Sequence, residues 1–188
     1  ASGVRELNVI SQDLSDYGTD LKADPNQNIY NLLKGLSEVK GVEWIRLFYF
    51  YPDELSDEVI DLISQTPNIC KYLDMPVQHF SSAILKRMNR RVTGDEIKQK
   101  IERLREKIPA MVLRTSVIVG FPGETEEDFQ MLADGIRSAC FDHLGVFKYS
   151  DEEGTPAFKL GPKVPQDVIE ERFAIIYELQ KEIAAKKN

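Results

Sequence analysis

Cysteine is scarce in this chain of 188 residues, which contains only Cys70 and Cys140. The two residues lie far apart and form no C-x-x-C pair, and no histidine-rich segment adjoins them. This spacing excludes the common zinc motifs and any iron–sulfur motif built from three nearby cysteines. We interpret both residues as reduced, buried thiols.

Long hydrophobic runs and an excess of basic residues are also missing. No apolar stretch is long enough to span a membrane, and no signal peptide is recognisable, which favours the cytoplasm. The formal net charge is -7, and strong nucleic-acid binding is not expected because it depends on basic residues that neutralise phosphates. The one local basic run, residues 86–91, is interpreted as a solvated helix end.

Several catalytic signatures are absent as well. The chain has no Ser/His/Asp set, no Walker-type lysine loop and no zinc spacing. What it does have is the hydrophobic and charged composition of an ordinary globular domain, with 42% hydrophobic residues to build a core.

Hydrophobic patterns predict strands that alternate with helices. Such alternation is typical of right-handed βαβ units and of a parallel sheet in the α/β class. The strands are too few for a closed eight-stranded barrel, so we expect a partial parallel barrel or an open twisted sheet whose first strand is missing. The predicted strands cover residues 4–11, 44–51, 71–77, 113–119 and 144–150.

The polar residues that follow these strands are the candidate site, because the carboxyl ends of parallel strands share one edge of a sheet. The most distinctive is the turn 120–123, in which two glycines bracket Phe121 and Pro122 and leave backbone N–H groups bare. A tight connection without function would explain this turn equally well. The other polar groups at strand ends are Gln12, Asp13, Tyr51, Gln78, His79, Tyr149 and Ser150.

Individual side chains in this set have a functional and a structural interpretation. His79 could orient a substrate or transfer protons, or could serve as a cap or a packing group. Gln12 and Asp13 could bind an amino group or a ribose, or could form an Asx turn. By strand alternation Arg114 and Ser116 share one face, where the arginine would bind a ligand carboxylate or form a structural ion pair.

Longer motifs resemble a known family. Residues 113–129, with the core I-V-G-F-P-G-E-T, resemble the fifth-strand motif of radical S-adenosylmethionine enzymes. Residues 11–13 and 88–90 resemble the methylthiotransferases among them. Residues 74–79 and 149–155 resemble the RimO branch, which methylthiolates an aspartate of a small-subunit ribosomal protein.

This resemblance implies a cofactor and its contacts. The family binds S-adenosylmethionine on a [4Fe–4S] cluster within a partial barrel, and it requires an electron donor. Gln12 and Asp13 would contact the methionine part of the cofactor, and Gln78 and His79 would lie on the ribose and substrate side. The remaining cofactor-binding candidates are Arg114, Ser116, Gly120, Phe121, Pro122, Gly123, Phe147 and Tyr149.

Three features depart from the family pattern. The C-x-x-x-C-x-x-C cluster motif is not in this sequence and is expected upstream of Ala1. Residues 1–188 would then be the central radical domain without its auxiliary-cluster and TRAM domains. This domain alone is expected to be inactive. Tyr51 stands where relatives often carry histidine, and Phe80 follows His79 where a small residue is usual.

The resemblance therefore implies methylthiolation of a ribosomal-protein aspartate in the cytoplasm, with no contact to a membrane. One alternative is a tRNA methylthiotransferase. A second is a cluster-free module that binds a phosphorylated ligand at the turn 120–123. A third is a purely structural interaction domain.

Overall fold

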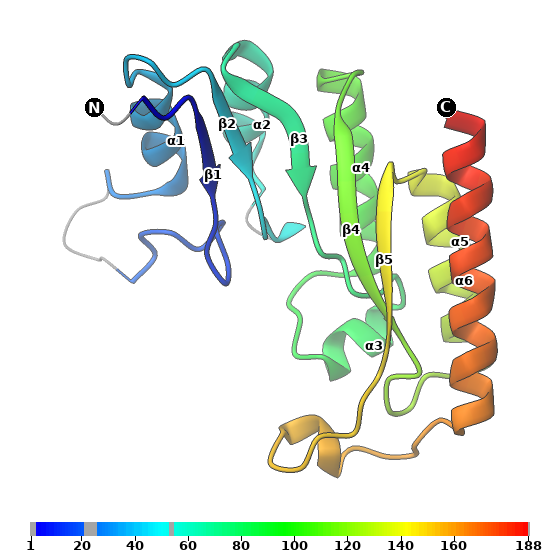
Figure 1. Ribbon diagram of the computed structural model, residues 1–188. Helices are drawn as coiled ribbons and strands as arrows, with labels where there is room; N and C mark the ends of the chain where they lie inside the picture. Colours follow the sequence, from blue (N-terminus) through cyan, green and yellow to red (C-terminus); the bar gives the residue numbers. More distant parts are fainter. Residues whose placement is uncertain (1–2, 21–25, 53–54, 188) are drawn as a thin grey trace. The chain divides into compact units, whose positions relative to one another are not determined.

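A computed structural model describes residues 3–20, 26–52 and 55–187. The chain is an α/β protein whose strands follow one another in the order β1-β2-β3-β4-β5, and the paired strands run parallel (Figure 1). The predicted fold class is thus confirmed. Contacts divide the chain into a first unit, residues 1–76 and 102–113, and a second unit, residues 77–101 and 114–188.

Within the described residues, the first unit holds three complete strands and two complete α-helices. The side chains of Ser56 and Asn28 cap the two helices by accepting the N–H groups of Val59 and Asn31. Ile45 and Leu47 of the middle strand are fully buried. The elements are β1 (Glu6–Val9), α1 (Ile29–Ser37), β2 (Trp44–Leu47), α2 (Asp57–Gln65) and β3 (Ile69–Asp74).

The second unit contains the turn that the sequence singled out. Two elements, α4 (Gly94–Lys107) and β4 (Val112–Val119), begin or end in the other unit. The remaining elements are α3 (Ser82–Arg87), α5 (Glu126–Ala139), β5 (His143–Lys148), the 3-10 helix η2 (Pro156–Lys159) and α6 (Gln166–Lys187).

Strand β4 alternates along its length between buried and half-buried side chains. Leu113, Val117 and Val119 are fully buried, whereas Arg114 and Ser116 share the more accessible face, as predicted. The strand pairs in parallel with β5, and α6 packs against both β5 and α5. The end of β4 is therefore held on a well-packed layer of helices.

The interpretation of the cysteines is wrong in part. Both are free thiols, but Cys70 is half-buried and Cys140 is exposed. Helix α5 ends at Ala139, and Cys140 follows as its C-cap with a left-handed backbone, φ 47°. The helical period that predicted burial of Cys140 stops one residue before it.

None of the helices in the described ranges is both long and apolar enough to cross a membrane.

The packing of the second unit can be tested at Gly135, which lies in α5 directly against the ring of Phe80. A Cβ on Gly135 would be 2.3 Å from Cγ of that ring, and the ring also lies 6.4 Å from Phe141, centroid to centroid.

We expect Gly135→Ala to lower the free energy of unfolding by about 1–3 kcal/mol, because the buried Phe80 ring cannot move aside without strain. The control is Gly35→Ala in α1, where a Cβ would meet no atom within 4 Å. That change should raise stability by up to about 1 kcal/mol through helix propensity. Urea unfolding measures both; equal effects of the two alanines would contradict this packing.

Candidate functional site

The connection from β4 to α5 is built as the sequence predicts. Gly120 and Gly123 have φ values of 78° and 86°, which other residues rarely adopt. Thr125 caps α5, and a reciprocal capping box with Asp128 is present. The hydroxyl of Thr125 accepts the Asp128 N–H at 3.2 Å, and the Asp128 carboxylate accepts the Thr125 N–H at 3.0 Å.

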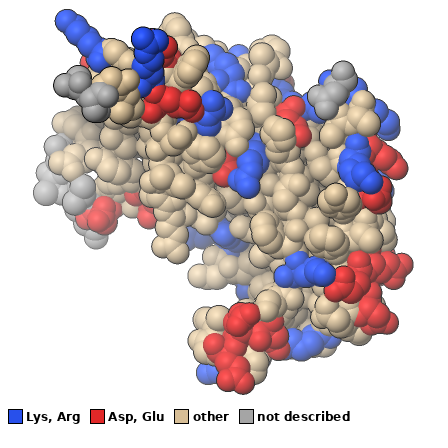
Figure 2. Space-filling view, viewed as in Figure 1, with Lys and Arg blue, Asp and Glu red and all other residues tan. Residues whose placement is uncertain are grey.

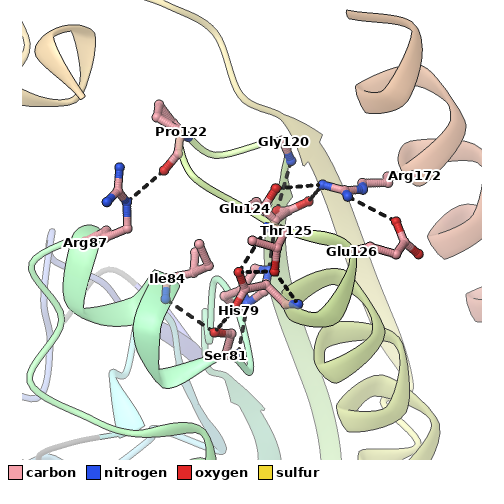
Figure 3. A network of polar contacts seen from close by, with 11 residues as sticks. His79, Ser81, Ile84, Arg87, Gly120, Pro122, Glu124, Thr125, Glu126 and Arg172 are labelled. Carbon is pink, nitrogen blue, oxygen red and sulfur yellow. Dashed lines mark hydrogen bonds and ion pairs between the residues drawn. The ribbon is translucent and has the colours of Figure 1, made fainter. Parts of the chain in front are cut away.

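The carboxylate of Glu124 is the centre of the turn, and its side chain has no exposed surface. One oxygen, Oε2, accepts the backbone N–H of Gly120 at 3.0 Å. The other, Oε1, accepts a hydrogen bond from Nη1 of Arg172 at 2.7 Å (Figure 3). Glu124 is not among the site residues predicted from the sequence, so its part in the turn was missed.

Arg172 reaches this turn from α6 and is 5% exposed. Its Nη1 also donates to the backbone oxygen of Glu124 at 3.2 Å, and its Nη2 to the Glu126 carboxylate at 3.1 Å. The guanidinium carbon lies 5.1 Å from the centre of the Phe129 ring. The signal that would have indicated Arg172 is its spacing from Ile169 and Ile176, which places a charge on the buried face of α6.

His79 faces the same carboxylate from the segment that follows β3. Its ring is fully buried, and Nδ1 accepts the Ser81 N–H at 2.9 Å. A neutral imidazole with this acceptor carries its proton on Nε2, which lies 3.4 Å from Oε2 of Glu124. His79 is therefore buried beside the turn, where its Nε2 makes no hydrogen bond to the described residues, and its predicted position beside substrate stays a prediction.

Asp128 joins the turn after β4 to the segment that follows β3. Its carboxylate accepts hydrogen bonds from the Ser81 hydroxyl at 2.5 Å and from the Thr125 hydroxyl at 2.7 Å. Burial alone would raise the pKa of Asp128, but these hydrogen bonds outweigh burial and hold the pKa below its ordinary value.

A cavity of about 420 Å³ opens beside the turn. Gln78 sits at its edge with a left-handed backbone, φ 67°, and pairs with β4: its N–H donates to the Ser116 oxygen, and its own oxygen accepts the Ile118 N–H, both at 2.9 Å. The lining combines apolar side chains with a few polar groups, as small-molecule sites do. It comprises Gln78, Arg87, Met88, Asn89, Arg90, Ile118, Phe121, Thr155, Pro156, Ala157 and Leu160.

A second cavity, of about 470 Å³, includes Gly120 and Tyr149 in its lining. The ring of Tyr149 meets that of Phe121 edge to face, with centroids 5.2 Å apart. Burial and the neighbouring Asp151 carboxylate raise the pKa of Tyr149. The structure thus brings Gln78, Gly120, Phe121 and Tyr149 into one region of the second unit.

Other predicted residues lie elsewhere. Arg114 lines a separate cavity of about 360 Å³ at the start of β5, where it pairs in register with His143. It lies six residues before Gly120 along β4, about 20 Å in an extended strand. Phe147 is 55% exposed. In the first unit, the Asp13 carboxylate accepts the Ser15 N–H at 3.0 Å, the Asx turn that was one of its two interpretations.

The donor set for a metal is limited. Among the described ranges, no three His, Cys, Asp or Glu side chains come together in a way that could hold a metal ion. The residues of this region can therefore bind and orient an organic ligand, but they do not form a metal centre.

Comparisons with known proteins bear out the resemblance drawn from the sequence motifs. A sequence model of the radical SAM superfamily matches residues 13–136. A ribosomal protein uS12 methylthiotransferase RimO from Geobacter sulfurreducens is 49% identical over all 188 residues, which are 42% of that protein. The corresponding RimO of Myxococcus xanthus is 49% identical over 187 residues, 39% of its length. The chain thus spans about two fifths of these relatives.

Solved structures show the same fold. Coproporphyrinogen III oxidase (HemN) from Escherichia coli, a radical SAM enzyme, has a TM-score of 0.61 and 24% identity over 80% of this chain and 36% of its own. Streptococcus suis SuiB bound to S-adenosylmethionine has a TM-score of 0.57 and 14% identity over 94% of this chain and 37% of its own.

The Glu124–Arg172 pair can be tested by removing its charges one at a time. Arg172→Met should lower the free energy of unfolding by about 3–5 kcal/mol, because it leaves a carboxylate buried without its partner. The double variant Glu124→Gln with Arg172→Met should recover much of that loss, since a neutral amide oxygen can still accept the Gly120 N–H. Urea unfolding measures both; a double variant less stable than Arg172→Met would contradict the pairing.

The lowered pKa of Asp128 makes the free energy of unfolding depend on pH. A lowered folded pKa contributes stability above the unfolded pKa of about 3.9, and this stability is lost as pH falls through the folded pKa. Asp128→Asn should cost about 1 kcal/mol at pH 7 and should flatten the acid decline of stability below pH of about 4. Asp134→Asn on the exposed face of α5 is the control and should cost at most about 0.5 kcal/mol. Identical acid profiles of Asp128→Asn and the unmodified chain would refute this role.

Proposed function

Because this chain belongs to the radical SAM superfamily, we propose that it serves the methylthiolation of an aspartate of ribosomal protein uS12. The observation that carries this proposal is the identity of nearly one half, over the whole chain, to relatives named for that reaction. With this function the chain would act in the cytoplasm and would need an electron donor as a further partner.

The pocket supports S-adenosylmethionine as the cofactor. A Cβ at Gly120 would lie 2.4 Å from Ile169, so only glycine lets α6 approach the turn this closely. The cavity that adjoins the turn is large enough for a nucleoside and offers the Gln78 side chain and the Phe121 ring at its wall. These are the features expected for an adenosyl group that is held by stacking and a few hydrogen bonds.

Several of the sequence-derived contacts can be carried into this pocket. Gln78 and Phe121 would hold the adenosyl part, and Tyr149 would fix the Phe121 ring from behind. The predicted backbone contacts of Gly120, Pro122 and Gly123 are not carried over, because these residues do not line the cavity and the N–H groups of Gly120 and Gly123 already donate to Glu124 and Pro162. Ser116 acts through its backbone oxygen, which positions Gln78 at 2.9 Å. Arg114 does not belong to this set, because it lines the cavity at the other end of β4.

Other contacts rest on the family resemblance alone. Gln12 and Asp13 would meet the methionine part of the cofactor, and Phe147 would flank the adenine from the last strand, β5. When bound, S-adenosylmethionine supplies the radical chemistry by which this family removes hydrogen from unactivated C–H bonds. The described residues offer no set of thiolates for a [4Fe–4S] cluster, so the chemistry assigned to this chain is limited to binding and orientation.

The proposal is tested in the organism that carries this sequence. Disruption of the gene should abolish the mass increase of one uS12 aspartate that corresponds to a methylthio group in place of hydrogen, measured by mass spectrometry of uS12 peptides. Restoring the unmodified gene should restore that mass. A His143→Ala gene should restore it equally, since His143 lies at the start of β5 and away from the turn. Persistence of the modification after disruption would rule the function out.

A further inference from the structure

Arg87, a member of the basic run 86–91, donates hydrogen bonds to two backbone oxygens. Arg87 ends α3, and its Nε donates to the backbone oxygen of Pro122 at 2.9 Å (Figure 3). Its Nη2 donates to the backbone oxygen of Gly161 at 2.7 Å. The interpretation of this run as a solvated helix end is confirmed at Lys86 and Arg87, which end α3 and are both exposed, and Arg87 in addition bonds these two backbone oxygens.

The guanidinium of Arg87 also packs against Gly123. A Cβ on Gly123 would lie 2.8 Å from Cζ, Nε and Nη2 of Arg87, so any other residue here would collide with the arginine. The Gly123 N–H in turn donates to the backbone oxygen of Pro162 at 2.7 Å. Together these contacts join the end of α3, the turn after β4 and the loop before α6.

These three segments form the walls of the cavity beside the turn. Residues 87–90 come from the end of α3, Phe121 comes from the turn, and residues 155–157 with Leu160 precede Gly161. The far end of η2 is held by Lys163, whose Nζ donates to the backbone oxygen of Phe158 at 2.9 Å. Gly161 directly follows the wall formed by residues 155–160. Through its bonds to Gly161 and Pro122, Arg87 thus ties that wall to the end of α3 and to the turn after β4.

We propose that Arg87 is a positioning residue of the nucleoside pocket, which sets the distance between the wall at residues 155–160 and the Phe121 ring. This role rests on the proposed function, because it takes the cavity to be the adenosyl site. A preformed wall spares the ligand the entropic cost of ordering residues 155–160 on binding.

The geometry requires arginine in particular. Two donors of one planar guanidinium reach carbonyl groups on two different segments. A lysine carries the same charge as a compact ammonium, which cannot lie flat on Gly123 while it bonds both carbonyls. A lysine at this position should therefore behave more like alanine than like arginine.

The experiment measures binding of 5′-methylthioadenosine, which lacks the amino and carboxylate groups that would need an iron. Calorimetry with the chain of 188 residues compares the unmodified protein with Arg87→Ala, Arg87→Lys and the control Lys86→Ala. We expect both Arg87 variants to bind about tenfold more weakly, and Lys86→Ala to bind within about twofold of the unmodified chain. Lys86→Ala removes the same charge from the same helix end.

Amide hydrogen exchange separates positioning from general damage to the fold. In Arg87→Lys, exchange should accelerate at Gly123 and Leu160, whereas Ile136 in the core of α5 should keep its protection. Unchanged affinity in both Arg87 variants would overturn the proposal, as would an equal loss in Lys86→Ala. Absence of binding by the unmodified chain would refute the nucleoside pocket and this role with it, while the uS12 modification would still decide the proposed function.

Discussion

The buried carboxylate of Glu124 is the constraint on which the second unit depends. Removing a carboxylate and a guanidinium from water costs several kcal/mol per ion, and only good geometry offsets that cost. Here both carboxylate oxygens are engaged, one by the Gly120 N–H and one by Arg172, while Arg172 also bonds the Glu124 backbone and lies against Phe129. An apolar pair would fill the same volume, but it would leave the Gly120 N–H without an acceptor.

The pair matters because the turn itself has little rigidity. Gly120 and Gly123 supply the left-handed backbone that the sharp bend needs, yet glycine is also the residue with the most conformational freedom to lose. Arg172 holds the turn through Glu124, and Arg87 holds it through Pro122, so side chains from two helices fix a backbone that could not fix itself. A ligand that stacks on Phe121 therefore meets a wall that is already in place.

Local features of the fold were predictable because their causes lie within a few residues. The alternation of β4 follows from the period of a strand and is confirmed, and the Thr125 capping box forms between two side chains only three residues apart. The roles of Glu124 and Arg87 were not predictable, because their partners are distant in the sequence: Arg172 is 48 residues from Glu124, and Gly161 is 74 residues from Arg87. The two interpretations of His79 stayed open for the same reason, since position after a strand does not reveal what packs over the ring.

These long-range contacts also show that most side chains of the motif after β4 hold the turn together, although the motif looks like a binding site in the sequence. Glu124 and Thr125 point into hydrogen bonds of the turn, and Gly123 makes room for Arg87. Of the turn's side chains, Phe121 alone lines the cavity of about 420 Å³. A ligand in this cavity would therefore meet one ring of the turn, and its specificity would come from Gln78 and from residues 155–160, which belong to other segments. A short motif can thus identify the family, whereas the shape of the cavity depends on parts of the chain that the motif does not contain.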